Sequence, residues 1–185
     1  DRLRSRGLGD VYKRQKLGCV VKLLATSFKK DEKVYAITAP FLIDATHPLY
    51  NVNDVLNGIY IHGNVIGDVM FFGAGAGKLP TASAVVADVV DCVKHKGRNV
   101  MTLWSYEKLE LGSAMEVERT FFVRIKDRAA LEKAKEAFHA VQTVTVDGLD
   151  DEFGLVTANM TEQAFAQAAA QFDVAGRIRF DKTTI

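Results

Sequence analysis

The sequence contains few cysteines and no excess of charge of either sign. Cys19 and Cys92 are its two cysteines, and we expect both to be buried, free thiols in a reducing cytoplasm, because each lies in an apolar stretch. Lys and Arg number 24 and Asp and Glu 23, which gives a net charge of +1. This balance gives no indication of a nucleic acid partner or an anionic membrane partner.

Long apolar runs and the common catalytic spacings are also lacking. Asp68 and Asp88 interrupt the most apolar stretches, so we expect no membrane-spanning segment. The four histidines have no metal-ligand spacing, so no metal site is expected, and no nucleophile-elbow pattern surrounds Ser83. With 48% hydrophobic and 25% charged residues, the composition is that of one or two globular domains.

The most informative stretch, residues 65–94, reads as a strand, a glycine-rich loop and a helix. The loop contains Gly73, Gly75 and Gly77, and Pro80 falls in the first helical turn, where proline is well tolerated. Four free N–H groups and the positive dipole end of such a helix form an anion site, which glycines leave open to a ligand. We therefore predict a ligand with a phosphate or carboxylate; the alternative is a tight turn that binds nothing.

Two phosphate-binding motifs come close to this loop and fail. A P-loop would need a glycine at Phe72 and a Ser or Thr at Leu79. The dinucleotide fingerprint needs one residue more than the three loop glycines supply, and a βαβ unit around them. No strand followed by such a fingerprint occurs elsewhere in the chain.

The longer string around the loop is more specific. From Gly73 to Asp88 it reads Gly-Ala-Gly-Ala-Gly-x-x-Pro-Thr-Ala-Ser-Ala-Val-Val-Ala-Asp, and it resembles the C-terminal signature of homoserine dehydrogenases. Residues 17–24 and 47–57 resemble the segments that precede this loop in the family. Residues 116–124 resemble the start of the family's C-terminal regulatory domain.

The resemblance implies an NAD(P)-dependent oxidoreductase that interconverts L-homoserine and L-aspartate 4-semialdehyde, in the biosynthesis of threonine, methionine and isoleucine. It implies that Gly77 contacts the nicotinamide cofactor through its backbone, with Gly75 and Thr81 beside it. It also implies a cytoplasmic protein that forms a homodimer or a higher homo-oligomer. The family's Rossmann domain, catalytic aspartate and catalytic lysine would precede Lys16, so we expect this chain to be inactive alone.

A hypothesis from another class is a non-catalytic, ACT-like amino-acid-binding or assembly module. The glycine loop would then serve only for packing. The sequence that precedes Lys16 in the gene would separate the two hypotheses, since only an enzyme needs a Rossmann fingerprint and a catalytic lysine there.

Four segments are expected along the chain. Residues 1–15 have five basic and two acidic residues and no structural period, and they read as a non-native, adaptor-derived segment; the chain would then begin within a gene. Residues 16–96 would be the C-terminal part of the catalytic domain and residues 97–117 a linker. Residues 118–185 would be the ACT-like domain.

The expected fold class is α+β. The first part should be an antiparallel or mixed sheet with a packed helix, followed by a ferredoxin-like βαββαβ domain of the ACT type. Strands are expected over 20–28, 34–43, 59–61 and 65–71, and helices over 51–57 and 82–94. Val85, Val89 and Val93 should form the inner face of the second helix, and Pro40 should mark an edge strand or the end of its strand.

In the C-terminal part, strands are expected over 120–126, 143–146, 153–158 and 177–180, and helices over 129–141 and 161–172. ACT domains usually have Asp-Arg-Pro-Gly where the first strand meets the first helix, whereas this chain has Asp-Arg-Ala-Ala at 127–130. The methyl group of Ala130 would hinder the approach of an effector carboxylate. A structural or dimerising role is therefore expected for this domain.

Overall fold

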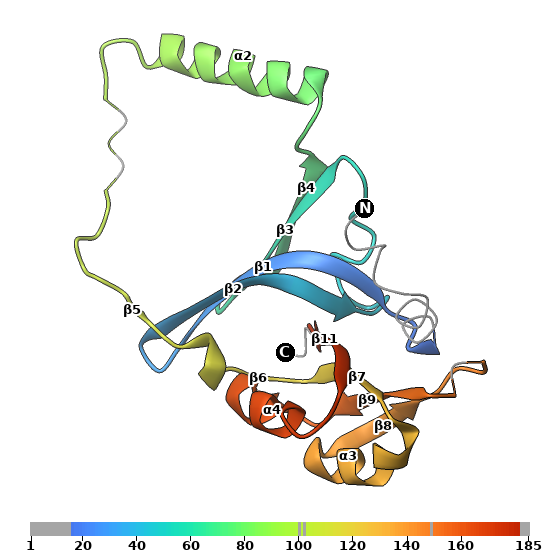
Figure 1. The fold of residues 1–185 in the computed structure, drawn as a ribbon. Coiled ribbons are helices and arrows are strands. Elements are labelled where there is room, and N and C mark those ends of the chain that lie inside the picture. Colours follow the sequence, from blue (N-terminus) through green and yellow to red (C-terminus); the bar gives the residue numbers. More distant parts are fainter. Residues whose placement is uncertain (1–15, 100, 102, 149, 182–185) are drawn as a thin grey trace. The chain divides into compact units, whose positions relative to one another are not determined.

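The computed structural model describes residues 16–99, 101, 103–148 and 150–181 (Figure 1). The chain divides into two compact units. The first contains the chain up to His47 and from Leu109 onward, and the second is Pro48–Lys108. The expectation for residues 1–15 lies outside the described residues. These units do not coincide with the segments expected from the sequence. The domain boundaries expected after residues 96 and 117 therefore stay a prediction.

A seven-stranded mixed sheet forms the first unit, in the order β1-β2-β11-β7-β9-β8, with β5 also paired to β2. β1 and β2 form a long antiparallel hairpin whose turn is at Asp31 and Glu32, both with positive φ. The pairs β2–β11 and β2–β5 are parallel, and the remaining pairs are antiparallel. The strands are β1 (Val20–Lys30), β2 (Lys33–Ile43), β5 (Glu110–Leu111), β7 (Phe121–Lys126), β8 (Ala140–Val144), β9 (Glu152–Thr157) and β11 (Val174–Phe180).

β2 is an inner strand, so the expectation that Pro40 marks an edge strand is wrong. Pro40 is paired with Leu23 of β1, and β11 joins the other side of β2 only from Phe41 onward. The strand ends at Ile43, three residues beyond the proline, so the other expectation, that Pro40 lies near the end of its strand, is confirmed. Its last three residues are fully buried.

From β7 onward the chain follows the order β-α-β-β-α-β that the sequence predicts. The helices are α3 (Leu131–Ala137) and α4 (Glu162–Ala169), with short 3₁₀ helices η1 (Ala114–Glu116) and η2 (Arg128–Ala130). A separate ladder pairs β6 (Glu118–Arg119) with β10 (Met160–Thr161). α3 is shorter than expected, because β8 already begins at Ala140 and includes the branched residues Val141, Thr143 and Val144.

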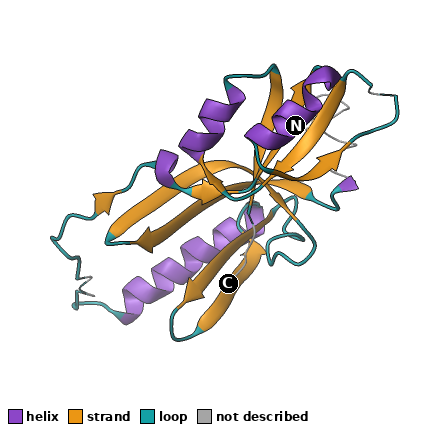
Figure 2. Ribbon diagram, turned by 90° about the horizontal axis from the view of Figure 1, so that it is seen from below, coloured by secondary structure: helices purple, strands orange, loops and turns teal. Residues whose placement is uncertain are grey.

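Alternating residues of β7 supply both faces of the sheet, whose strands are drawn in orange in Figure 2. Phe121, Val123 and Ile125 join a core with Ala134 and Phe138, together with Phe165 of α4. Phe122 joins a smaller cluster on the other face, which includes Leu42 and Ile178. Both helices therefore cover the same face of the sheet, and the aromatic rings of Phe121 and Phe165 stack with centroids 4.3 Å apart.

The second unit consists of a β-hairpin and a helix. β3 (Leu56–Gly63) and β4 (Gly67–Ala74) pair antiparallel, and α2 (Lys78–Lys94) follows the glycine-rich loop. The expected helix over 51–57 is absent from the structure: turns run up to Val55, and β3 begins at Leu56. A Cβ at Gly58 would lie 2.7 Å from Leu49 Cδ2 and 3.0 Å from Val52 Cγ2. The apolar side chains of that segment thus pack onto β3, and this packing overrides the local helical signal.

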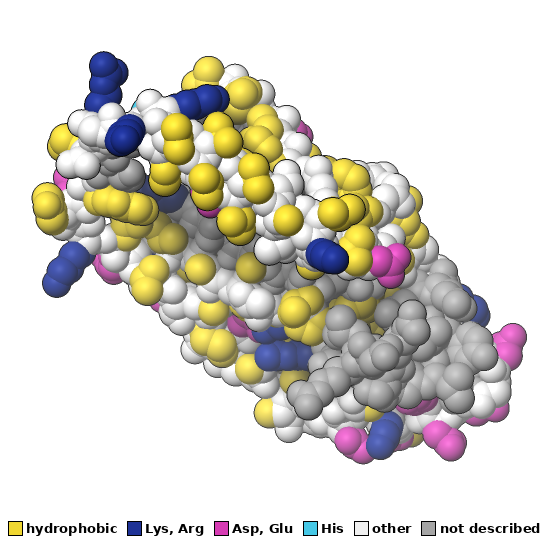
Figure 3. All heavy atoms as spheres, turned by 90° about the horizontal axis from the view of Figure 1, so that it is seen from above, with side chains coloured by type: hydrophobic (Ala, Val, Ile, Leu, Met, Phe, Trp, Pro, Cys, Tyr) yellow, Lys and Arg dark blue, Asp and Glu magenta, His cyan; other side chains and the backbone are white. Residues whose placement is uncertain are grey.

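The helix over 78–94 exists, yet the expectation of a packed helix is wrong for the described residues. None of its side chains is buried, and Val85, Val89 and Val93 are 57%, 57% and 69% exposed. Ile59 and Phe71 of the hairpin are exposed as well. Figure 3 shows hydrophobic side chains, in yellow, gathered on this exposed surface.

No helix in the described part of the chain has the length and apolar character needed to cross a membrane.

Cys19 and Cys92 are free thiols, as expected. Cys19 is partly buried, whereas Cys92 lies on exposed α2, so the expectation of burial is wrong for Cys92. The chain turns at His47, whose N–H donates to the Asp44 carbonyl at 3.1 Å.

Candidate functional site

The glycine-rich loop joins the end of β4 to the start of α2. β4 ends at Ala74, Gly77 is the N-cap residue of α2, and Lys78 is its first residue. The Thr81 N–H donates to the Gly77 carbonyl at 3.1 Å, which is the first backbone hydrogen bond of the helix. Pro80 lies in the first turn, as the sequence predicts.

Gly77 is required by its backbone conformation. Its φ of 118° and ψ of 160° lie in a region that is essentially restricted to glycine. Space is not the constraint there, because a Cβ would meet only Pro80 Cδ at an ordinary 3.6 Å. A side chain at residue 77 would therefore change the path of the chain into α2.

Gly75 is required for a different reason. A Cβ at this residue would lie 1.8 Å from Asn57 Nδ2 and 2.9 Å from Asn57 Cγ. The carboxamide of Asn57, on β3, thus lies against the bare backbone of the loop. At Gly73, by contrast, a Cβ would have no atom within 4 Å. The expectation that all three glycines leave room for a ligand is wrong at Gly75, where a side chain of the protein uses that room.

The start of α2 has the electrostatic character of an anion site. Its first turn has no acidic residue and no side-chain cap, and Lys78 adds a positive charge. Pro80 has no N–H, so three of the four expected donors remain, those of Gly77, Lys78 and Leu79, because the Thr81 N–H already makes the first helical bond. Lys78, Leu79 and Thr81 are exposed. The residues therefore fit a phosphate or carboxylate group.

The other end of the hairpin has a separate polar pair. His62 Nδ1 and Asp68 Oδ1 lie 2.7 Å apart. Hydrogen bonds from His62 and then Tyr60 lower the pKa of the Asp68 carboxyl. The described residues contain no cluster of three or more His, Cys, Asp or Glu side chains suited to a metal ion.

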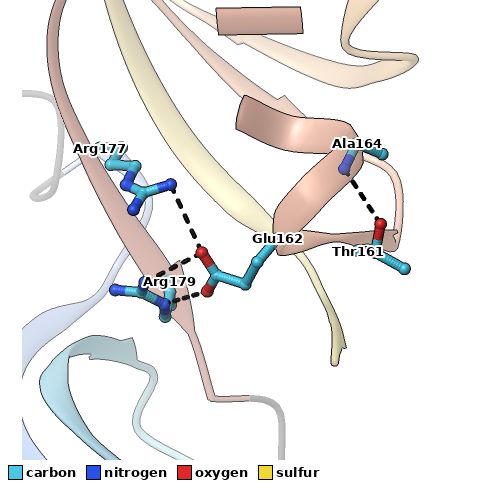
Figure 4. A network of polar contacts seen from close by, with 5 residues as sticks. All are labelled: Thr161, Glu162, Ala164, Arg177 and Arg179. Carbon is cyan, nitrogen blue, oxygen red and sulfur yellow. Dashed lines mark hydrogen bonds and ion pairs between the residues drawn. The ribbon is translucent and has the colours of Figure 1, made fainter. Parts of the chain in front are cut away.

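A polar network in the first unit surrounds Glu162, the first residue of α4. Figure 4 shows Arg177 and Arg179 reaching from β11 to this buried carboxylate. Arg179 Nη2 donates to Glu162 Oε2 at 3.0 Å, and Arg179 Nε also pairs with this carboxylate. Arg177 Nη1 lies 3.4 Å from Glu162 Oε2. Thr161 caps α4, because its Oγ1 accepts the Ala164 N–H at 3.1 Å. The alternation of Arg177 and Arg179 along β11 is the signal that could have indicated the pairing.

Arg119 lies in the same unit, on β6. Its guanidinium carbon is 5.0 Å from the centroid of the Phe41 ring. Burial lowers the pKa of Arg119, and the charge of Asp181 partly opposes that effect. These arginines and Glu162 tie the ends of β2, β6, β11 and α4 together.

The turn at 127–130 uses its own carboxylate as a cap. Asp127 has a φ of 96°, and its Oδ1 accepts the Ala129 N–H at 3.0 Å. An open hollow of about 660 Å³ adjoins this turn and is lined by Lys126, Arg128 and four carboxylates, Asp127, Asp150, Asp151 and Glu152. A ligand carboxylate would meet an excess of negative charge there.

Fold and site together define an α+β protein with a glycine-rich loop at an uncapped helix N-terminus. A family model described as homoserine dehydrogenase matches residues 3–90. The homoserine dehydrogenase of Lactococcus lactis is 41% identical over 47% of this chain and 20% of its own length. That of Mycobacterium bovis is 28% identical over 85% of this chain and 41% of its own length. The chain thus spans between a fifth and two fifths of these curated relatives.

Solved structures agree with this comparison. A homoserine dehydrogenase from Thiobacillus denitrificans matches with a TM-score of 0.78 at 24% identity, over 94% of this chain and 45% of that one. One from S. aureus matches with a TM-score of 0.69 at 26% identity, over the same shares. By these findings the chain is similar to part of the homoserine dehydrogenases, and they do not favour the non-catalytic module. The family match includes residues 3–15, whose assignment as a non-native segment stays a prediction.

Proposed function

We propose that the chain is part of an NAD(P)-dependent enzyme that interconverts L-homoserine and L-aspartate 4-semialdehyde, and that its loop binds the cofactor. The observation that carries the proposal is the glycine-only conformation of Gly77 at the uncapped start of α2. It occurs inside the segment that the homoserine dehydrogenase model matches. An anionic dinucleotide is a ligand that this geometry suits.

The roles of the three site residues follow from that geometry. Gly77 would present its backbone to the cofactor, because no side chain stands in the way. Gly75 would hold the preceding turn of the loop, and Thr81 would fix the first turn of α2 through its bond to the Gly77 carbonyl. NAD(P) itself supplies the hydride chemistry. No catalytic residue is assigned to this chain.

The C-terminal βαββαβ part is proposed to be an ACT-like domain with a structural or dimerising role. Two observations support this role over effector binding. The carboxylate of Asp127 already accepts the Ala129 N–H at the turn, and the adjoining hollow has four carboxylates against two cations. We further propose a cytoplasmic homo-oligomer in the pathway to threonine, methionine and isoleucine, with no nucleic acid or membrane partner.

The proposal is tested by a homoserine-dependent reduction assay. The intact enzyme, expressed from the full gene, should form NAD(P)H from NAD(P)⁺ when L-homoserine is added. The 185-residue chain alone should show no turnover, because the Rossmann fingerprint does not occur in it. Absence of activity in the intact protein, or turnover by the chain alone, would contradict the proposal.

A further inference from the structure

Asn57, on β3, contacts the glycine-rich loop through its side chain. Its Cα is paired with that of Gly73 on β4. From there its carboxamide reaches Gly75, where a Cβ would come within 1.8 Å of Nδ2. The side chain therefore spans the last residues of β4 and the middle of the loop.

The loop depends on this contact because little else supports it. Gly75 and Gly77 are exposed, and α2 has no buried side chain in the described part of the chain. A glycine loop has unusually large conformational freedom, and restricting that freedom requires contacts from outside the loop. The absence of a Cβ at Gly75 lets the backbone lie directly on the Asn57 carboxamide.

We propose that Asn57 is a positioning residue for the cofactor loop: by packing against Gly75, it holds the backbone of Gly75 and Gly77 in the conformation that binds the ligand. This inference rests on the proposed function of the loop. It differs from that function by assigning the shape of the site to a side chain on the neighbouring strand.

The first test measures the loop itself and needs no activity. In the ¹⁵N-glycine-labelled 185-residue chain, Asn57→Ala should shift the backbone amide signals of Gly75 and Gly77. Asn53→Ala is the matched control, because the Asn53 side chain donates to the Asn51 carbonyl at 3.3 Å, within the turn that precedes β3. That control should leave both signals in place. Unchanged signals in Asn57→Ala would overturn the proposal.

The second test is a mutant cycle in the intact enzyme. Asn57→Ala should raise the KM for NAD(P) about tenfold, since small displacements of positioning groups have large effects. The kcat and the KM for homoserine should stay within about twofold of the wild type if only cofactor placement is affected. Asn57→Leu, which keeps the branched shape but replaces the polar carboxamide with methyl groups, should keep the KM for NAD(P) within about threefold of the wild type.

Gly75→Ala should have the same effect as Asn57→Ala, because its new methyl group must push the Asn57 side chain aside. The double variant should therefore also show about a tenfold higher KM for NAD(P), while independent residues would give about a hundredfold. Multiplying effects would overturn the proposal. Shifted glycine signals with an unchanged KM for NAD(P) would overturn it too, by showing that the loop does not hold the cofactor; failure of the proposed function itself would appear as absent homoserine-dependent reduction.

Discussion

Asn57 occupies the space in which any side chain at Gly75 would lie, with its Nδ2 atom 1.8 Å from the ideal Cβ position. This relationship separates the two glycines of the proposed site. Gly75 is fixed by a neighbouring side chain, whereas Gly77 is fixed by its own φ of 118°. Glycine is thus required at both positions, but for different physical reasons.

Gly112→Ala should destabilise the sheet of the first unit. A Cβ there would lie 2.2 Å from Tyr35 Cε1, and the Tyr35 ring already stacks on Phe28 with centroids 5.3 Å apart. Moving the ring should cost about 1–3 kcal/mol of unfolding free energy. Urea denaturation can measure it, with Gly176→Ala as a control, because a Cβ at Gly176 meets no atom within 4 Å. Equal stability of the two variants would refute the explanation.

Glu162→Gln should destabilise the chain strongly. Glu162 is only 3% exposed and pairs with Arg177 and Arg179, so its loss leaves partly buried cations without their counter-charge. We expect a loss of about 3 kcal/mol in urea denaturation. The control is Glu132→Gln, since Glu132 pairs with Lys135 on an exposed surface and should change the stability by less than about 0.5 kcal/mol. A loss that is no larger for Glu162 would contradict the role of the network.

The two thiols should react at different rates. Burial, and then the negative charge of Asp44, raise the pKa of Cys19, so less of this thiol is thiolate at neutral pH. Cys92 is exposed on α2. Iodoacetamide should modify Cys92 first in the native chain, as followed by mass spectrometry of peptides. Raising the pH should speed the modification of Cys19. Faster modification of Cys19 at neutral pH would show that its environment is misassigned.

Elements with strong local patterns were predictable from the sequence. The branched residues of β1 and β2, the turn at Asp31 and Glu32, and the cap at Thr161 each have a local physical signal, and the structure has each of them. The strand-loop-helix order around Gly77 was predictable for the same reason. The glycines, the proline and the start of the helix are neighbours in the sequence, so a local pattern is enough to indicate them.

Features that depend on distant residues were not predictable in this way. The segment before Leu56 has helical caps, but its Leu49 and Val52 pack on Gly58 of β3 instead. The pairing of Glu162 with Arg177 and Arg179 joins residues that the fold, and not the local sequence, brings together. The valines of α2 have a clear helical period, which shows that they form one face but not what covers it.

The central claim is that the loop before α2 holds the nicotinamide cofactor, and Gly77→Val in the intact enzyme tests it most directly. Valine cannot adopt the backbone conformation of Gly77, so the loop must change. Gly97→Val is the control, because Gly97 also has a positive φ, of 78°, and lies in open space beyond the other end of α2. We predict that Gly77→Val raises the KM for NAD(P) at least about tenfold more than the KM for homoserine. Equal effects on both KM values, or the same effect in Gly97→Val, would contradict the assignment of the loop.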